Sequence, residues 1–329
     1  MMLGASAVPS VALALGVLKL PESPRWLVMQ GRLRDAKKVL ALVCDSKEET
    51  ELRLHDIKRA AGIDENCEEE NGVVKVPAST SRGEGVWREL LLKPSPAVRW
   101  ILIASVGLHF FDHTTGIEVV VLYSPRLFSK AGVSGKDRLL LATVGMGLCK
   151  TAFTLVATFL LDKVGRRPLL LTSVGGMIFA LSGLGFCLTM AEHSKEKLLY
   201  ALSLSIVFVY LYVAFFSIGI GPITWVYSSE IFPLRLRAQG TSIGGAVSRI
   251  MNGTVSMTFI SICQAITIGG TLFVFAGIAV LAWIFFYFFL PETKGRSLEE
   301  IETLFARNVS KPGNSEVEIQ RSDTNGCSM

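Results

Sequence analysis

A set of ionisable side chains lies within one long apolar segment of the sequence. His109, Asp112 and His113 fall at positions i, i+3 and i+4, which places them on one face of a helix. Ionisable groups inside a membrane span are costly unless they face a cavity or a partner, so they are candidates for function. Imidazole and carboxylate groups can hydrogen-bond hydroxyl groups and can carry a proton. Gly116 permits a local break in this helix, and Glu118 follows the break.

Two other roles stay open for this polar set. Asp112 could pair with His109 or His113 and simply hold helices together. Two histidines and a carboxylate could also begin a zinc site, although the sequence offers no evident further ligand. The sequence favours a polar helix face that lines a cavity, with a hinge at Gly116, over these alternatives.

A charged loop, residues 162–168, separates two later apolar segments. Gly165 allows a tight reversal of the chain, and Asp162 and Arg166 can pair with helix ends or neighbouring loops. The basic residues can also act as a cytoplasmic anchor, and both roles can hold together.

Another break is expected after the fifth apolar segment. Gly219, Gly221 and Pro222 interrupt a helical pattern at membrane depth, which is tolerated only where protein or a water-filled cavity satisfies the backbone. Trp225, beside this break, is either an interfacial residue or a stacking platform for a ring or a polyol chain.

The elements that position these residues are predicted to be membrane spans. Apolar residues make up 50% of the 329-residue chain, and about two thirds of its charges fall in residues 21–98 and 291–329. Such segregation argues against a single water-soluble domain, a fibrous repeat or a disordered chain. Segments of about 20 apolar residues predict seven spans: residues 2–20, 99–123, 139–161, 168–190, 199–221, 239–262 and 270–290.

The loops predict orientation. Placing residues 21–98 and the C-terminus in the cytoplasm puts 23 Lys and Arg residues on that side and 6 on the other. The net charge of +5 comes without a basic and aromatic cluster, so no nucleic-acid partner is expected. Six cysteines without a CxxC pair predict neither a disulfide framework nor a metal site.

The long loop after the first span is predicted to have two parts. Residues 32–60 carry apolar side chains at near-helical spacing among charges, including Leu33, Ala36, Leu40 and Val43, which predicts short amphipathic helices. The acidic and Pro/Ser/Thr/Gly-rich stretch from Asp64 to Gly85, and the tail after Phe305, are predicted to be unstructured.

Five motifs in order resemble the sugar porter family of the major facilitator superfamily. They are Pro21 to Leu27, Gly116-Ile117 followed by Tyr123-Ser124-Pro125, Asp162 to Pro168, Gly221-Pro222 with Trp225 and Glu230, and Pro291 to Gly295. The sequence of residues 109–118 and 121–125 looks most like plant polyol/monosaccharide transporters. The resemblance covers nearly the whole chain but only the last seven of the family's twelve spans.

The resemblance implies an all-α integral membrane fold, a six-helix C-terminal bundle plus one preceding helix. Its expected parts are residues 1–20, the last helix of an incomplete N-terminal bundle; 21–98, a cytoplasmic loop with short amphipathic helices and a disordered acidic part; 99–290, the six-span bundle; and 291–329, a cytoplasmic tail. The plasma membrane is the location that the resemblance suggests.

The resemblance also assigns roles by position. Substrate hydroxyls are expected to contact Asp112, His113, Glu118, Trp225, Ser248 and Asn252. Here Asp112 and His113 replace a glutamine pair, and Glu118 replaces an asparagine, so neutral amides become groups that titrate. Glu22, Arg25, Asp162, Arg166, Glu230 and Arg237 match a gating network of cytoplasmic charges, and Gly116, Gly221 and Pro222 are the expected hinges. Lys150 and Arg249 have no family role; Lys150 could pair with Glu118.

Two classes of function follow. The first is a secondary active transporter of polyols or monosaccharides that works by alternating access, with no cofactor and the proton as expected coupling ion. The second is a truncated, non-transporting membrane protein or a regulator of a full-length carrier, favoured by the five missing spans. An enzyme is disfavoured because the sequence shows no nucleophile–base pair, phosphate loop or metal-ligand spacing. Expected partners are a small polyol or sugar and the lipid bilayer; the oligomeric state stays open.

Overall fold

The computed structural model describes residues 7–60, 63, 86–130, 135–193, 199–233 and 235–295. It divides the chain into two compact units, Met1–Trp87 and Arg88–Met329, and each is described by itself. Every regular element among the described residues is helical. The predicted acidic linker at 64–85 and the tail after Phe305 lie outside the described residues.

Among its described residues the first unit contains four helices, α2 (Ala7–Val17), α3 (Pro24–Met29), α4 (Leu33–Val43) and α5 (Lys47–Ala60). Helices α3, α4 and α5 pack on one another. They enclose a small apolar core formed by Leu27, Val28, Leu33, Ala36, Leu40, Leu54, Ile57 and Ile63. The amphipathic helices predicted here therefore bury their apolar faces against each other, although Val43, at the end of α4, is exposed.

The start of α5 shows how sequence fixes a helix boundary. The hydroxyl of Ser46 accepts a hydrogen bond from the backbone N–H of Glu49, and the Glu49 carboxylate accepts one from the N–H of Asp45. These reciprocal bonds satisfy N–H groups that have no partner inside the helix. They hold the turn between α4 and α5, across which Lys37 and Glu51 form an ion pair.

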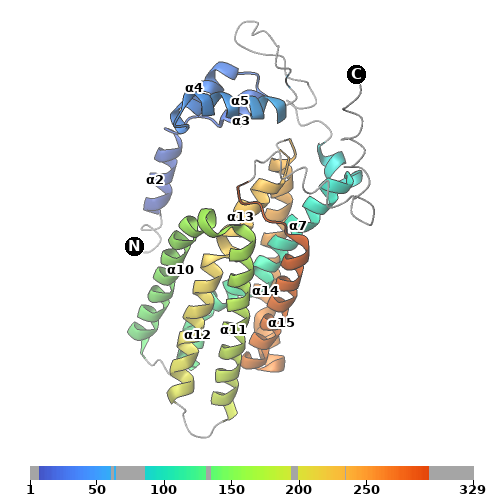
Figure 1. Cartoon of the computed structure of the whole chain (residues 1–329). Coiled ribbons are helices and arrows are strands. Elements are labelled where there is room, and N and C mark those ends of the chain that lie inside the picture. Colours follow the sequence, from blue (N-terminus) through green and yellow to red (C-terminus); the bar gives the residue numbers. More distant parts are fainter. Residues whose placement is uncertain are drawn as a thin grey trace, which may run out of the picture. The chain divides into compact units, whose positions relative to one another are not determined.

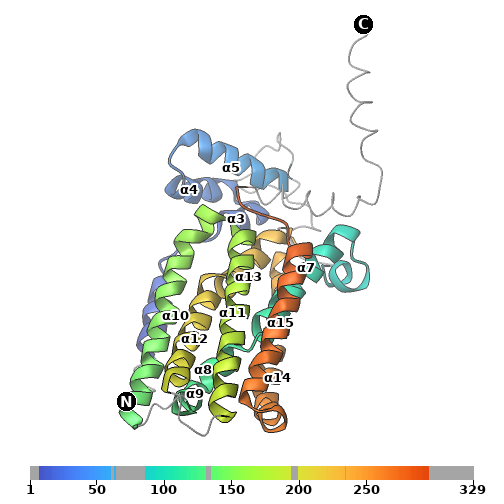
Figure 2. The ribbon, with the colours of Figure 1, turned by 60° about the horizontal axis from the view of Figure 1, so that its bottom comes forward.

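The second unit is a bundle of long helices that run side by side (Figure 1). Its elements are a π-turn at Arg88–Leu92, then α7 (Pro96–Thr114), α8 (Ile117–Leu122), α9 (Ser124–Lys130), α10 (Lys136–Val164), α11 (Arg166–His193), α12 (Leu199–Ile218), α13 (Ile220–Ile231), α14 (Arg237–Ile266) and α15 (Ile268–Phe289). Helix α11 packs between α12 and α15, and α7 packs mainly against α14, with α13 and α15 beside it. The second view also shows α11 between α12 and α15 (Figure 2).

Four segments among the described residues are long and apolar enough to cross a membrane: Asp137–Val164, Arg166–Ala191, Ser203–Ile231 and Ile268–Phe289. Helices α7 and α14 occupy two of the other predicted spans but are more polar. The second half of α7 carries His109, Asp112 and His113, and α14 is rich in Gly, Ser and Thr. Polar content of this kind is tolerated in a span where the helix faces other protein or water rather than lipid.

The break after α7 depends on Gly116. This residue has φ +88°, a conformation that favours glycine, and a Cβ there would lie 2.9 Å from the Phe275 ring. The carbonyl of Thr115, freed by the break, accepts a hydrogen bond from the Tyr212 hydroxyl at 3.0 Å. The buried backbone is thus satisfied by a neighbouring helix, as a membrane interior requires.

A second break separates α12 from α13 at Gly219, two residues before the expected hinge residues. Gly221 and Pro222 lie in the first turn of α13. The ring of Pro222 conflicts with the carbonyl four residues earlier, that of Ile218, so the preceding helix ends there. The Ser173 hydroxyl bridges the break, donating to the Phe215 carbonyl at 2.6 Å and accepting from the Ile220 N–H at 3.3 Å.

Candidate functional site

Four side chains around the end of α7 form what we call the polar cluster: His109, Asp112, His113 and Glu118. His109 has no exposed surface, Asp112 is 3% exposed and His113 is 9% exposed. Glu118, in the first turn of α8, is partly buried. The interruption at Gly116 therefore separates three buried side chains of one helix from a carboxylate at the start of the next.

The polar cluster has few protein partners. Both ring nitrogens of His109, the Oδ1 atom of Asp112 and the Nδ1 atom of His113 have no hydrogen-bond partner among the described residues. Asp112 Oδ2 and His113 Nε2 are 3.8 Å apart, which is too long for a hydrogen bond. The hypothesis of a purely structural Asp112–His113 pair therefore rests on an ion pair at 3.8 Å without a hydrogen bond. Buried polar atoms without protein partners are expected to bind water or a ligand.

Other charges act on this cluster from neighbouring helices. Asp112 interacts electrostatically with Glu118 and with Lys150 of α10. The Lys150 ammonium lies 6.0 Å from the centre of the Phe216 ring. Lys150 thus gives the Asp112 carboxylate a nearby positive charge. The described residues contain no group of three or more His, Cys, Asp or Glu side chains that could hold a metal ion.

Trp225 of α13 adjoins the polar cluster. Its ring lies edge-to-face with the His109 imidazole, at 5.0 Å between centroids and 77° between planes. The indole is 47% exposed, whereas its neighbours Thr224 and Ile223 are buried. The structure thus joins a half-exposed aromatic surface to a buried polar set. His109 was absent from the expected substrate contacts, although its i, i+3 spacing with Asp112 could have indicated it.

The two expected site residues on α14 have different surroundings. Ser248 is buried, and its hydroxyl has no hydrogen-bond partner among the described residues. It lies one turn after Gly244, which faces His109, so it shares the surface of α14 that packs on α7. Asn252 is partly buried, and its amide oxygen accepts a hydrogen bond from Ser256 at 3.4 Å. Ser248 therefore shares with the polar cluster a buried polar atom without a partner among the described residues, whereas the Asn252 amide oxygen has one.

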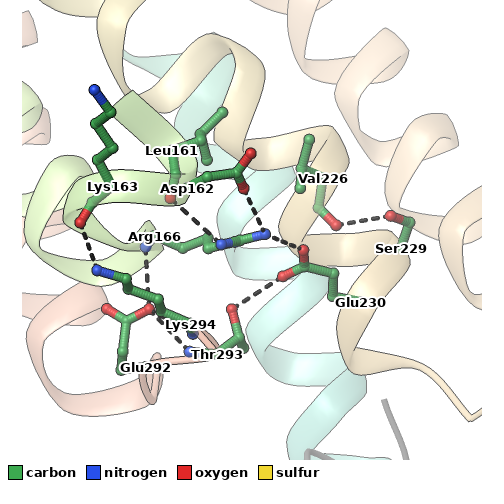
Figure 3. A network of polar contacts seen from close by, with 10 residues as sticks. All are labelled: Leu161, Asp162, Lys163, Arg166, Val226, Ser229, Glu230, Glu292, Thr293 and Lys294. Atoms are coloured by element: carbon green, nitrogen blue, oxygen red, sulfur yellow. Dashed lines mark hydrogen bonds and ion pairs between the residues drawn. The ribbon is translucent and has the colours of Figure 1, made fainter. Parts of the chain in front are cut away.

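Where α10 meets α11, charged side chains contact one another directly in what we call the charge network (Figure 3). Arg166 Nη2 lies 2.9 Å from Glu230 Oε1 and 3.6 Å from Asp162 Oδ1. The second carboxylate oxygen of Glu230 accepts a hydrogen bond from the Thr293 hydroxyl at 3.0 Å. Arg166 and Glu230 are mostly buried, with side chains 16% and 18% exposed, whereas Asp162 is 81% exposed.

Glu292 completes this network. Its two carboxylate oxygens accept hydrogen bonds from the backbone N–H groups of Arg166 and Arg167, each at 3.0 Å. A carboxylate at the first N–H groups of a helix satisfies unpaired donors and complements the helix dipole. The segment after α15 is thereby held at the start of α11 (Figure 3). Glu292 was not an expected site residue, although it lies in the motif from Pro291 to Gly295.

Three other residues, Glu22, Arg25 and Arg237, were expected to belong to the gating network. Arg237, at the start of α14, donates a hydrogen bond to the Phe232 carbonyl at 3.2 Å. Glu22 and Arg25 flank the start of α3 and belong to the first unit. Their participation in the network stays a prediction.

Comparisons with known proteins agree with this arrangement. Residues 1–305 match the model of the family "Sugar (and other) transporter". Among curated relatives, "Probable polyol transporter 6" of Arabidopsis thaliana is 62% identical over 311 residues, which are 94% of this chain and 63% of the relative. "Polyol transporter 5" of the same plant is 58% identical over 306 residues, 93% of this chain and 56% of the relative. The chain thus spans about three fifths of the length of these relatives.

A solved structure gives the same result for the fold. The proton:xylose symporter XylE, bound to 6-bromo-6-deoxy-D-glucose, superposes with a TM-score of 0.73 at 27% identity, covering 92% of this chain and 58% of that one. This confirms the predicted all-α membrane fold. The matched families are transporters rather than enzymes, as the sequence indicated. The chain belongs to the sugar (and other) transporter family of the major facilitator superfamily.

Proposed function

We propose that this chain carries the substrate site of a secondary active transporter that moves polyols or monosaccharides by alternating access. The observation that carries the proposal is the polar cluster, whose buried His109, Asp112 and His113 atoms lack protein partners among the described residues and lie beside a half-exposed Trp225. The names of the polyol transporters and of the xylose symporter among its relatives support this substrate class.

The chemistry of the cluster suits hydroxyl-rich solutes. Carboxylates of Asp112 and Glu118 accept hydrogen bonds from hydroxyl groups, and the imidazole of His113 both donates and accepts. The face of Trp225 offers an apolar surface on which the C–H side of a sugar ring or polyol chain can stack. Ser248 adds a hydroxyl from α14, and Asn252 is the more distant candidate. The positions at Gly116, Gly221 and Pro222 allow local rearrangement around this site.

The charge network has the properties of a latch. A partly buried ion pair such as Arg166–Glu230 contributes little net stability but strongly disfavours states that separate its partners. Because Glu292 ties the segment after α15 to the start of α11, the pair joins three helical elements at one end of the bundle. We assign this end to the cytoplasm, since Lys and Arg are concentrated in its loops, and expect the plasma membrane as the location.

The proton is the proposed coupling ion. The structural relative XylE is a proton:xylose symporter, so proton coupling occurs in a protein of this fold. In this chain the groups that can carry a proton at membrane depth are Asp112, Glu118 and the imidazoles of His109 and His113. No cofactor is required for this mechanism.

Uptake in transporter-deficient yeast tests the proposal. Cells that express this chain, with membrane localisation verified, are given labelled sorbitol, inositol or glucose, with and without an uncoupler. We expect uptake of at least one solute that the uncoupler abolishes. Absence of uptake by a correctly inserted chain would refute transport by this chain alone and favour the regulatory alternative.

A matched pair of variants links uptake to the site. Asp112→Asn removes the buried negative charge and is expected to reduce uptake by about a hundredfold, because several hydroxyl contacts depend on that carboxylate. Asp137→Asn neutralises an exposed carboxylate in the first turn of α10 and should leave uptake unchanged. Equal effects of the two substitutions would contradict a role for the polar cluster.

A further inference from the structure

His109 is the member of the polar cluster whose burial is hardest to explain by its own bonds. Its imidazole is completely buried, yet neither ring nitrogen has a hydrogen-bond partner among the described residues. A buried polar side chain in that situation calls for a specific explanation. Packing rather than hydrogen bonding must therefore hold the ring in place.

The packing that holds His109 comes from α14. A Cβ at Gly244 would lie 2.3 Å from His109 Cδ2 and 2.8 Å from Nε2, so the imidazole occupies the space that any other residue at 244 would fill. Helices α7 and α14 are extensively packed, which fixes the ring from this side. Glycine at this position allows the close approach of ring and helix.

On its other side the imidazole meets Trp225. The two rings are 5.0 Å apart and nearly perpendicular, a favourable arrangement for an aromatic pair. Trp225 is half exposed. A Cβ at Gly245 would lie 3.9 Å from its indole, an ordinary van der Waals distance. Thus His109 gives the half-exposed indole of Trp225 an aromatic partner.

We propose that His109 is a positioning residue: wedged against Gly244, it fixes the orientation of Trp225 and thereby pre-forms the stacking surface for the substrate. This inference rests on the proposed function for its consequence but not for its geometry. A side chain that is already fixed loses less conformational freedom on binding, so affinity rises. The wedge involves one residue from each of three helices, α7, α13 and α14.

Tryptophan fluorescence tests the geometry without any substrate. The chain contains five tryptophans, so the signal of Trp225 is taken as the difference between each protein and its Trp225→Phe counterpart, for the purified full chain in detergent. In His109→Ala, acrylamide is expected to quench this component about twice as strongly, because the indole has lost its partner. In Gly244→Ala the displaced imidazole should produce a similar change. Gly253→Ala lies on the same helix, where a Cβ meets nothing within 4 Å, and should produce none.

Sorbitol titrations provide the functional part of the test. His109→Ala and Gly244→Ala are each expected to weaken sorbitol binding about fivefold, the size of a lost aromatic pair contact. The double variant should be no weaker than His109→Ala alone, because Gly244→Ala acts only through the imidazole. Additive effects would overturn the wedge, even if the variants are less stable.

The outcomes separate this inference from the proposed function. Unchanged quenching of Trp225 in both His109→Ala and Gly244→Ala overturns the positioning role, whatever the protein transports. If the unsubstituted chain binds and moves no polyol or sugar, the proposed function fails, and the quenching experiment still decides whether His109 positions Trp225.

Discussion

Two regions of the bundle, the charge network and the polar cluster, treat their charged groups in opposite ways. In the charge network Arg166, Glu230 and Glu292 each contact a protein group within 3.0 Å, and the loop and helix ends that carry them are tied together. In the polar cluster the carboxylate of Asp112 and the rings of His109 and His113 are more deeply buried but lack such bonds among the described residues. The fold thus satisfies one set of charges and leaves the other available.

This difference distinguishes buried polar groups that stabilise the fold from buried polar groups that are available to bind a ligand. A partnered buried charge contributes to which conformation is stable, because removing one partner strands the other. An unpartnered buried charge costs stability and persists where a ligand uses it. The charge network should therefore respond to substitution through stability and conformation, and the polar cluster through binding. Four predictions test this contrast.

Gly116→Ala should have the largest effect on stability. Alanine must adopt φ +88°, which costs about 1–2 kcal/mol, and its Cβ must displace the Phe275 ring, so we expect the free energy of unfolding to fall by about 3 kcal/mol. Equilibrium unfolding in mixed detergent micelles measures it. Gly295→Ala shares the positive φ but meets nothing within 4 Å, and should cost about 1 kcal/mol. Equal losses would show that the Phe275 contact is irrelevant.

Arg166→Ala should follow, with a loss of about 2 kcal/mol, because it leaves the mostly buried Glu230 carboxylate with only Thr293 as partner among the described residues. If the network is a latch, the substitution also changes the labelling rate of a cysteine introduced at the exposed Ser229 position. Lys163→Ala is the control, since the network uses only its backbone carbonyl, and its side chain points away (Figure 3). If Arg166→Ala and Lys163→Ala have the same stability and the same labelling rate, the charge network does not differ from the polar cluster in the way proposed.

Much of the fold could be predicted because membrane spans depend on local hydropathy. The predicted span 168–190 became α11 at Arg166–His193, and 139–161 became α10 at Lys136–Val164. Both helices extend beyond their apolar parts, since helical hydrogen bonds continue where polar side chains can reach water. The break before α13 lies at Gly219, one of the three residues expected to interrupt the helix, because proline disrupts a helix through the carbonyl four residues earlier, not at its own position.

The site could be predicted only in part. Helical spacing put His109, Asp112 and His113 on one face, and the structure buries all three. The contact between His109 and Trp225 depends on how α7 packs against α13, which periodicity within one segment does not specify. Likewise, the bond from Arg166 to Glu292 joins residues 126 positions apart, so only the packed bundle shows it.

The third prediction concerns the stability of Asp112→Asn, the variant expected to lose uptake. Because Asp112 Oδ1 has no partner among the described residues, replacing the charge by a neutral amide should leave the free energy of unfolding unchanged or raise it by about 1 kcal/mol. The same unfolding measurement as for Gly116→Ala applies. A fall in the free energy of unfolding of more than about 2 kcal/mol would show that Asp112 stabilises the fold, and it would weaken the contrast between the charge network and the polar cluster.

Asp162→Asn should have the smallest effect, although Asp162 belongs to the charge network. Its carboxylate is 81% exposed and 3.6 Å from Arg166, so water and salt screen the pair, and we expect a loss of about 0.3 kcal/mol that disappears at high ionic strength. Glu230→Gln is the matched comparison: the same neutralisation of an Arg166 partner, but at 2.9 Å and mostly buried, with a larger loss that salt does not remove. Equal losses of stability with equal salt dependence in Asp162→Asn and Glu230→Gln would show that burial does not determine the strength of the ion pairs with Arg166. The presence of a nearby charge would then be enough to explain the network.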